Sequence, residues 1–202
     1  MGCYDLESPL LTQSSRSGWV GLCRGKDLPM EKAFAEIIEK CDLALNTPDP
    51  QASIETILLE ATRDPDIADA IAGRRKFADL SDLAIHRTER LTLLAGALPP
   101  GFRAAPHNHN LWSVVGVCAG QEDNQFFERD GDRLRQIGQA SVAGPGVLAN
   151  DADVIHAICN PLDVPLLALH AYGGDLFATP RSNWDPETHE EIPFDWEKVR
   201  SK

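Results

Sequence analysis

Residues 106–120 read Pro-His-Asn-His-Asn-Leu-Trp-Ser-Val-Val-Gly-Val-Cys-Ala-Gly, a stretch that predicts both a strand and a binding site. Side chains alternate along a strand, so His107 and His109 should point to the same face of it. The apolar run from Trp112 to Cys118 is rich in Val, which is typical of a buried strand. Two imidazoles aimed together into an apolar interior favour a bound metal, since neutral imidazole is a common ligand of Zn, Fe, Cu and Ni.

Short β-strands separated by turns fill most of the chain after Leu83. Asp130-Gly131 is a strong hairpin signal, and Gly144-Pro145-Gly146 marks a further turn. Such spacing is typical of a sandwich or barrel, so we predict a mainly β, double-stranded β-helix barrel over residues 83–178. The expected strands include residues 91–97, 112–118, 125–128, 134–137, 154–159 and 165–172.

A helical pattern precedes the barrel. The apolar residues of the first expected helix recur at three- and four-residue steps and form one stripe: Phe34, Ile37, Ile38, Cys41 and Leu45. Two more helices are expected over residues 51–62 and 65–76. Residues 28–82 should therefore form a helical cap on one side of the barrel.

The two ends of the chain differ from the barrel in composition. Residues 1–27 show no sustained period and are expected to be a flexible N-terminal segment. Residues 179–202 are acidic and contain several prolines. This C-terminal tail is expected to pack on the barrel through three aromatic residues, Trp184, Phe194 and Trp196.

Composition excludes several classes of partner for a chain of 202 residues. The net charge of -12 disfavours binding to nucleic acid or to an anionic membrane, both of which need a basic face. No apolar run is long enough to span a bilayer, and no secretory signal is visible. The five cysteines form no CxxC pair, which favours reduced thiols and a cytoplasmic protein over a disulfide framework.

A third histidine follows the Gly-Pro-Gly turn. His156 lies ten residues after Gly146, and Asn160 follows it with three residues between. With His107 and His109 it would complete a facial set of three nitrogen ligands. On octahedral iron such a set leaves about three open positions, which non-haem oxygenases use for O₂ and substrate. Zinc would instead hold one water, and the chemistry would be hydrolytic or isomerising.

These motifs resemble those of the cupins. The resemblance lies in Pro-His-x-His, in Gly120, in the Pro145-Gly146 turn and in His156-x3-Asn160. The acidic fourth ligand of germin-type cupins is absent, since Val114 stands at its position. In this the chain is similar to the thiol dioxygenase branch, which comprises cysteine dioxygenase and 3-mercaptopropionate dioxygenase. The similarity covers about residues 87–181, including residues 168–173, which resemble the Ser-x-His-x-Tyr relay of those enzymes.

The resemblance implies roles for six residues. His107, His109 and His156 would bind Fe(II), although Zn, Ni or Mn could take its place in purified protein. Tyr172 would place its hydroxyl near the substrate, and His170 would hold that phenol in position. Arg181 would bind the substrate carboxylate as a bidentate clamp. Trp112, interpreted from the sequence alone, is expected in the core or as a pocket wall that contacts the substrate.

Three positions depart from the family pattern. Val114 replaces the cysteine that crosslinks to the tyrosine in animal cysteine dioxygenases, so no thioether is expected. Ala168 replaces the relay serine, which leaves His170 without that partner. The position at which cysteine dioxygenases carry their carboxylate-binding arginine aligns near Ser81, and Arg87 is close enough to substitute if the register shifts. Glu122, in Gly-Gln-Glu-Asp-Asn, is interpreted as part of a solvated turn, with an approach to the site from the adjoining strand as the alternative.

The resemblance implies a dioxygenase that converts a small thiol carboxylate and O₂ into a sulfinate. Two alternatives stay open on the sequence. The first is a cupin that uses another metal for isomerisation, decarboxylation or ring cleavage. The second is a cupin that binds a small molecule without turnover. Cupins often dimerise, so a homodimer is one assembly that the resemblance allows.

Overall fold

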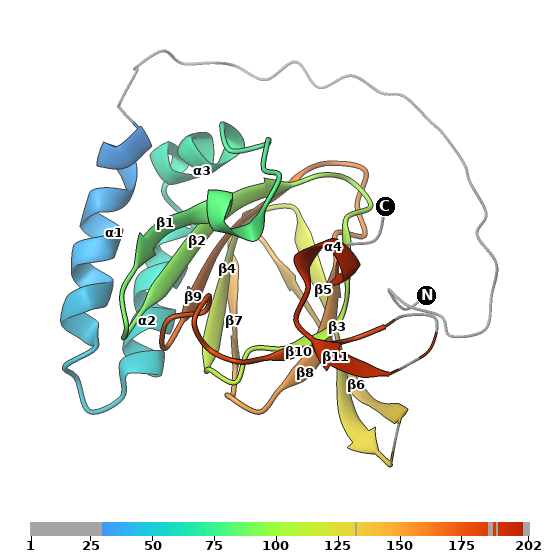
Figure 1. Cartoon of the computed structure of the whole chain (residues 1–202). Coiled ribbons are helices and arrows are strands. Elements are labelled where there is room, and N and C mark those ends of the chain that lie inside the picture. The colour runs from blue at the N-terminus through green and yellow to red at the C-terminus, as the bar shows by residue number, and fades with distance from the viewer. Residues whose placement is uncertain (1–29, 132, 186–187, 189, 200–202) are drawn as a thin grey trace.

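Two antiparallel sheets face each other and enclose a barrel interior (Figure 1). The computed structural model describes residues 30–131, 133–185, 188 and 190–199. The strand order is β1-β2-β9-β4-β7 in the first sheet and β11-β10-β3-β8-β5-β6 in the second. The strands are β1 Ala84–Arg87, β2 Thr92–Leu98, β3 Arg103–Asn108, β4 Ser113–Ala119, β5 Gln121–Asp130, β6 Arg133–Ala143, β7 Gly146–Asn150, β8 Ile155–Cys159, β9 Leu166–Tyr172, β10 Ser182–Trp184 and β11 Glu191–Pro193. From β2 to β9 the chain changes sheet at every connection except β5–β6, which is the double-stranded β-helix that the sequence predicts.

Three helices, α1 Met30–Ala44, α2 Pro50–Ala61 and α3 Pro65–Ala72, cover the outer face of the first sheet (Figure 1). Asp49 and Asp64 cap α2 and α3, since each side chain accepts a hydrogen bond from a backbone N–H of the first turn, and a proline follows each cap. Their apolar faces meet the sheet in one cluster that includes Phe34, Cys41, Ile54, Leu58, Ile71, Leu93, Val114, Leu169 and Ala171. The predicted helical cap on one side of a β barrel is therefore confirmed.

Alternation along β9 separates the two sides of the first sheet. Leu169 and Ala171 pack against the helices, whereas Ala168 and Tyr172 belong to clusters on the other face, inside the barrel. His170 shares the parity of the inward residues and lines the interior cavity. The strand thus delivers its polar side chains to the barrel interior.

Two boundaries differ from the sequence prediction. α3 ends at Ala72 instead of Lys76, because Arg74 leaves the helix to bind β2: its Nε donates to the Ala95 carbonyl oxygen at 2.9 Å. The tail does more than pack on the barrel. β10 pairs with β3, and β11 pairs with β10, so the tail extends the second sheet. A short helix, α4 Trp196–Val199, follows β11. The remaining short helix, the 3-10 turn η1 Leu80–Leu83, precedes β1.

The turn between β4 and β5 requires a glycine. Gly120 has a φ of 84°, and a Cβ placed on it would lie 2.9 Å from the Pro165 carbonyl oxygen. The tight turn starts β5 at Gln121, directly after β4. This start places the polar residues at the beginning of β5 inside the barrel.

The cysteines depart in part from the expectation of reduced thiols. Cys41 and Cys118 are free, but Cys159 is disulfide-bonded. The predicted flexible segment, residues 1–27, lies outside the described residues. In the part of the chain that is described, no helix is long and apolar enough to cross a bilayer.

Candidate metal centre

Three histidines from two paired strands form a cluster in the barrel interior. His107 is on β3, His109 follows the end of that strand, and His156 on β8 is the register partner of His107. All three are buried, and one ring nitrogen of each lies within 4.8 Å of the others. The structure therefore brings together the three residues that the motifs single out. Among the described residues, no cysteine or carboxylate joins this cluster.

Hydrogen bonds fix which ring nitrogen can bind a ligand. Nδ1 of His107 donates to the Ala105 carbonyl oxygen at 2.8 Å, and Nδ1 of His156 donates to Oδ1 of Asn124 at 2.8 Å. Nε2 of His156 is buried and has no hydrogen-bond partner in the described structure. Burial lowers the pKa of His107 to about 4 and the pKa values of His109 and His156 well below their usual range. Neutral imidazoles with unused lone pairs fit a divalent metal.

Asn124→Ala is expected to weaken metal binding roughly 10- to 100-fold, the usual effect of removing the partner that orients a ligating imidazole. Without the amide, the ring of His156 loses the hydrogen bond that holds its Nε2 toward the cluster. Titration of the metal-free protein with Zn(II) against a competing chelator measures the change. Gln139→Ala, at an exposed position on the neighbouring β6, is the control. Equal affinities in the two variants would show that Asn124 does not orient a ligand.

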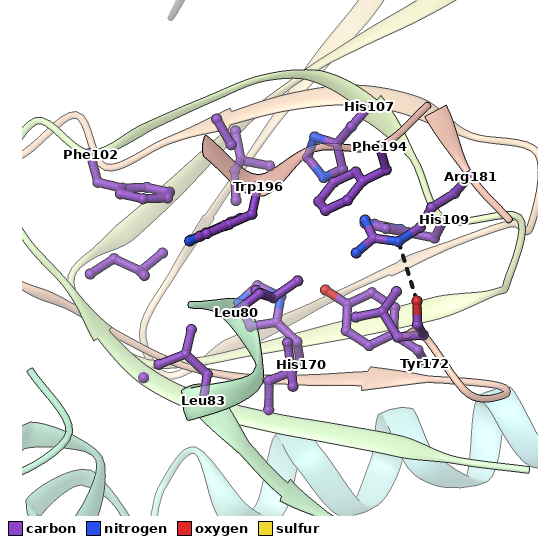
Figure 2. A pocket seen from close by; sticks show the side chains of 16 residues that line it. Leu80, Leu83, Phe102, His107, His109, His170, Tyr172, Arg181, Phe194 and Trp196 are labelled. Atoms are coloured by element: carbon purple, nitrogen blue, oxygen red, sulfur yellow. Dashed lines mark hydrogen bonds between the residues drawn. The ribbon is translucent and has the colours of Figure 1, made fainter. Parts of the chain in front are cut away.

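A small cavity of about 60 Å³ adjoins the cluster (Figure 2). Its walls are mostly apolar and include Leu80, Leu83, Leu94, Leu98, Phe102, Ile158, Leu176, Phe194 and Trp196. Figure 2 shows Tyr172 and Arg181 at one end, near His109, and Phe102 at the other. A more open pocket of about 470 Å³ shares Leu80, Leu176, Arg181, Phe194 and Trp196 with the cavity. Arg181 therefore borders both the interior and the route from outside.

Tyr172 and His170 stand side by side on the cavity wall formed by β9. Their rings are nearly parallel, with centroids 6.4 Å apart, and the Tyr172 ring meets the His109 ring edge-on at 4.8 Å. Burial raises the pKa of Tyr172 above its usual range and lowers the pKa of His170 to about 4. At neutral pH the phenol is therefore a hydrogen-bond donor, and the imidazole of His170 is uncharged.

Arg181 brings a guanidinium into this apolar cavity. It lies over the Phe194 ring at 3.2 Å from the ring centroid, and its Nε donates to the Leu176 carbonyl oxygen at 3.3 Å. Within the described part of the chain, no aspartate or glutamate forms an ion pair with it. Burial lowers the pKa of Arg181 to about 10, so it remains charged at neutral pH. A cation with no acidic partner among the described residues, in a mostly apolar cavity, favours an anionic ligand.

Glu122 lies beside the site on β5, which agrees with the alternative to the favoured solvated turn. It is 1% exposed on β5, not in a solvated turn, and its Oε1 accepts a hydrogen bond from Asn124 at 3.1 Å. Its Oε2 lies 3.7 Å from Nε2 of His170. The available signal was the two-residue spacing of Glu122 and Asn124 immediately after a glycine turn, which places both on the inward face of one strand.

Glu122→Gln is expected to stabilise the metal-free protein at pH 8. Burial raises the pKa of Glu122 from 4.5 to about 7, so the folded state holds this proton more tightly than the unfolded state. The contribution of this group to the free energy of unfolding is complete below pH 4.5 and is lost as the pH rises through 7. The total loss is roughly 3 kcal/mol. Glutamine does not titrate. The difference in unfolding free energy between the variant and the wild type should therefore grow from pH 4.5 to pH 8.

Chemical denaturation across that pH range measures this difference. The groups facing the carboxyl, His170 on β9, Tyr172 on β9 and the neighbouring Asp123 on β5, are the same in both proteins. Their own titrations consequently cancel to first order. A difference that does not vary with pH would mean that the carboxyl has an ordinary pKa.

Trp112 and Arg87 do not line the cavity. Side chains alternate along a strand, so Trp112 points to the same face as Val114, which faces the helices. It packs on that face and against Gly173, where a Cβ would lie 2.0 Å from the indole. The expected contact of Trp112 with substrate stays a prediction. Arg87 pairs with Asp175 through two hydrogen bonds of 2.9 and 3.0 Å at the surface. Of the two candidate arginines, only Arg181 lines the cavity.

No protein-family model matches the chain. One similar solved structure is a protein from Bacillus halodurans, with 20% identity over 54% of this chain and 77% of that chain and a TM-score of 0.44. Another is a cupin superfamily protein from Desulfitobacterium hafniense, with 16% identity over 54% of this chain and 87% of that chain and a TM-score of 0.41. Oxalate decarboxylase of Bacillus subtilis, which has Mn(II) centres, matches at 16% identity over 44% of this chain and 22% of its own length, with a TM-score of 0.37. The chain has a cupin fold.

That statement rests on the strand order of the two sheets, because likenesses at these identities concern the fold alone. The cupin barrel presents its inward histidines on β3 and β8. What the site does must be argued from its own residues.

Proposed function

We propose that this protein is a non-haem Fe(II) thiol dioxygenase that oxidises a small thiol carboxylate to its sulfinate. The reaction adds both atoms of O₂ to sulfur: RSH + O₂ gives RSO₂H, so sulfur loses four electrons and O₂ gains four. One observation carries the proposal. Two members of a neutral three-histidine cluster, His107 and His109, line one small cavity together with a protonated phenol and a guanidinium that has no acidic partner among the described residues.

Each part of the cavity suits one part of such a substrate. Arg181 can pair bidentately with the carboxylate, which would orient the molecule with its thiol toward the histidine cluster. Tyr172 can donate its phenol hydrogen to the reacting end. The apolar walls exclude water and make both polar contacts stronger. The small volume favours a short thiol over a peptide.

His107, His109 and His156 would hold the iron. When bound, Fe(II) would supply open coordination positions and the one-electron chemistry that O₂ requires. Three neutral imidazoles leave the positive charge of the metal uncompensated, which favours a thiolate as its partner. Arg181 and Tyr172 would orient the thiol carboxylate and so hold its sulfur close to the metal position.

The decisive experiment measures O₂ uptake by protein loaded anaerobically with Fe(II). The substrates are 3-mercaptopropionate, cysteine and cysteamine, and sulfinate is assayed in parallel. Uptake and sulfinate should match one to one with a carboxylate-bearing thiol and should be weakest with cysteamine. Protein shown to hold iron that consumes no O₂ with any of the three thiols would refute the proposal. Identification of the metal in protein purified as the cell makes it, whether Zn, Ni or Mn, would then direct the search to another activity.

A further inference from the structure

Polar groups lead from the histidine cluster toward the wall that carries Tyr172, and hydrogen bonds join them from His156 to Glu122. His156 donates from Nδ1 to Asn124, and Nδ2 of Asn124 donates to Oε1 of Glu122 at 3.1 Å. The other carboxyl oxygen, Oε2, lies 3.7 Å from Nε2 of His170. His170 in turn stands beside Tyr172 on β9. Glu122 is the group at which the two halves of this series of polar groups meet.

The carboxyl of Glu122 is incompletely satisfied in the ligand-free site. Oε2 is buried and has no hydrogen-bond partner among the described residues. A buried acceptor left unpaired costs free energy, and more so when it is charged. The imidazole of His170 is placed to pair with it, and 3.7 Å exceeds a hydrogen bond by less than 1 Å. Contacts of this kind often tighten when an active site fills.

We propose that Glu122 is a positioning residue of the candidate active site. One carboxyl oxygen holds His170 beside Tyr172, and the other, through Asn124, holds His156 toward the metal position. This inference rests on the proposed function for its effect on turnover. The arrangement itself is independent of which reaction the site performs.

Glu122 supplies the partner that Ala168 cannot. Ala168 lies two residues before His170 on the same face of β9, where its methyl group offers no hydrogen bond. Glu122 comes from β5 in the opposite sheet and reaches His170 across the barrel interior. Support for the imidazole is thereby moved from its own strand to the strand that also supports His156.

The donor and acceptor directions follow from the metal position. If Nε2 of His156 binds metal, its Nδ1 carries hydrogen and must donate to Oδ1 of Asn124. The amide of Asn124 then presents its NH₂ to Glu122, which accepts with Oε1. An ionised Glu122 can only accept, so His170 must carry its hydrogen on Nε2. Its Nδ1 is left as an acceptor.

Glu122→Gln reverses the last of these directions without changing the shape of the side chain. The glutamine oxygen must stay on the NH₂ of Asn124, so its own NH₂ faces Nε2 of His170. His170 must then accept at Nε2 and carry hydrogen on Nδ1. The variant therefore changes the tautomer of His170, which a residue that only fills space would not do.

Nitrogen-15 NMR of histidine-labelled, Zn(II)-loaded protein at pH 8.5 tests this directly, because protonated and unprotonated ring nitrogens differ widely in chemical shift. Zinc is diamagnetic and keeps the measurement independent of O₂ chemistry. At pH 8.5 Glu122 is ionised in the wild type. We expect the Nε2–H form of His170 in the wild type and the Nδ1–H form in Glu122→Gln. Glu128→Gln, which removes a partly exposed carboxylate from the same strand, should leave His170 unchanged.

Turnover provides the second readout. In Fe(II)-loaded Glu122→Gln, kcat should fall roughly 10- to 100-fold, the usual cost of losing the support of a group at the metal or reacting atoms. KM for the thiol should change much less, because Arg181 is untouched. Metal content should remain that of the wild type, since the contact to Asn124 is kept. The control Glu128→Gln should match the wild type in all three measurements.

An unchanged His170 tautomer in Glu122→Gln overturns the inference whatever the rate. If the wild type is active, a kcat of Glu122→Gln within about twofold of the wild-type value also overturns the inference, since the position of His170 would then have no effect on turnover. Loss of metal from the variant without a change at His170 would reduce Glu122 to a support for His156 alone and would likewise overturn it. A wild type that consumes no O₂ refutes the proposed function instead, and the tautomer measurement still decides the role of Glu122.

Discussion

Replacing His156 with alanine should remove metal binding and thiol oxidation together. Only two neutral nitrogens, those of His107 and His109, would remain in the cluster. We expect metal affinity to fall by more than the roughly 10- to 100-fold typical of losing a ligand's hydrogen-bond partner. After anaerobic Fe(II) loading and desalting, the variant should retain almost no iron. Metal analysis and O₂ uptake on the same sample measure both losses.

A second histidine provides the matched control for this variant. His86 on β1 lies on the helix side of the first sheet, where its Nε2 is 3.0 Å from Asp42, and it does not line the cavity. His86→Ala should keep wild-type metal content and turnover. Added imidazole should restore part of the metal binding of His156→Ala, because it fits the space that the variant leaves. Stoichiometric iron in His156→Ala without imidazole would place the metal elsewhere.

The barrel and the histidine cluster could be predicted from sequence because both depend on local patterns. Alternation fixed the shared face of His107 and His109, and Gly and Pro turns marked where the strands end. The third ligand, His156, could be chosen only through its resemblance to a known motif. No pattern along the chain states that β8 lies beside β3. The tail illustrates the same limit, because the pairing of Asn183 with His107 joins strands distant in sequence.

Glu122 shows why the sequence favours the wrong one of two interpretations. The sequence Gly-Gln-Glu-Asp-Asn has the composition of an exposed turn, and hydrophobic periodicity cannot reveal a buried strand whose inward residues are polar. Trp112 shows the same limit for an apolar residue. Its character suits either the core or a pocket wall, and only the structure places it on the helix-covered face. Burial depends on which face of a sheet is covered, and that is a tertiary property.

Replacing Arg181 with alanine should raise KM for 3-mercaptopropionate by roughly 10- to 100-fold, since a hydrogen bond to a charged group contributes about 1.5–3 kcal/mol. The guanidinium has no acidic partner within the described chain, so removing it exposes no unpaired carboxylate. The KM of Arg181→Lys should lie between those of the wild type and Arg181→Ala, because an ammonium keeps the charge but cannot form a bidentate pair with a carboxylate. Steady-state O₂ uptake over a range of thiol concentrations measures both constants.

The strongest form of this test pairs the variant with a substrate that lacks the carboxylate. Cysteamine cannot use the clamp, so Arg181→Ala should lower kcat/KM sharply for 3-mercaptopropionate and hardly at all for cysteamine. The two thiols should then become similar substrates of the variant. Arg135→Ala removes an arginine from the exposed β5–β6 hairpin and should change neither value. Equal losses with both thiols would mean that Arg181 supports the cavity wall through Phe194 and Leu176, and that the substrate carboxylate is bound elsewhere.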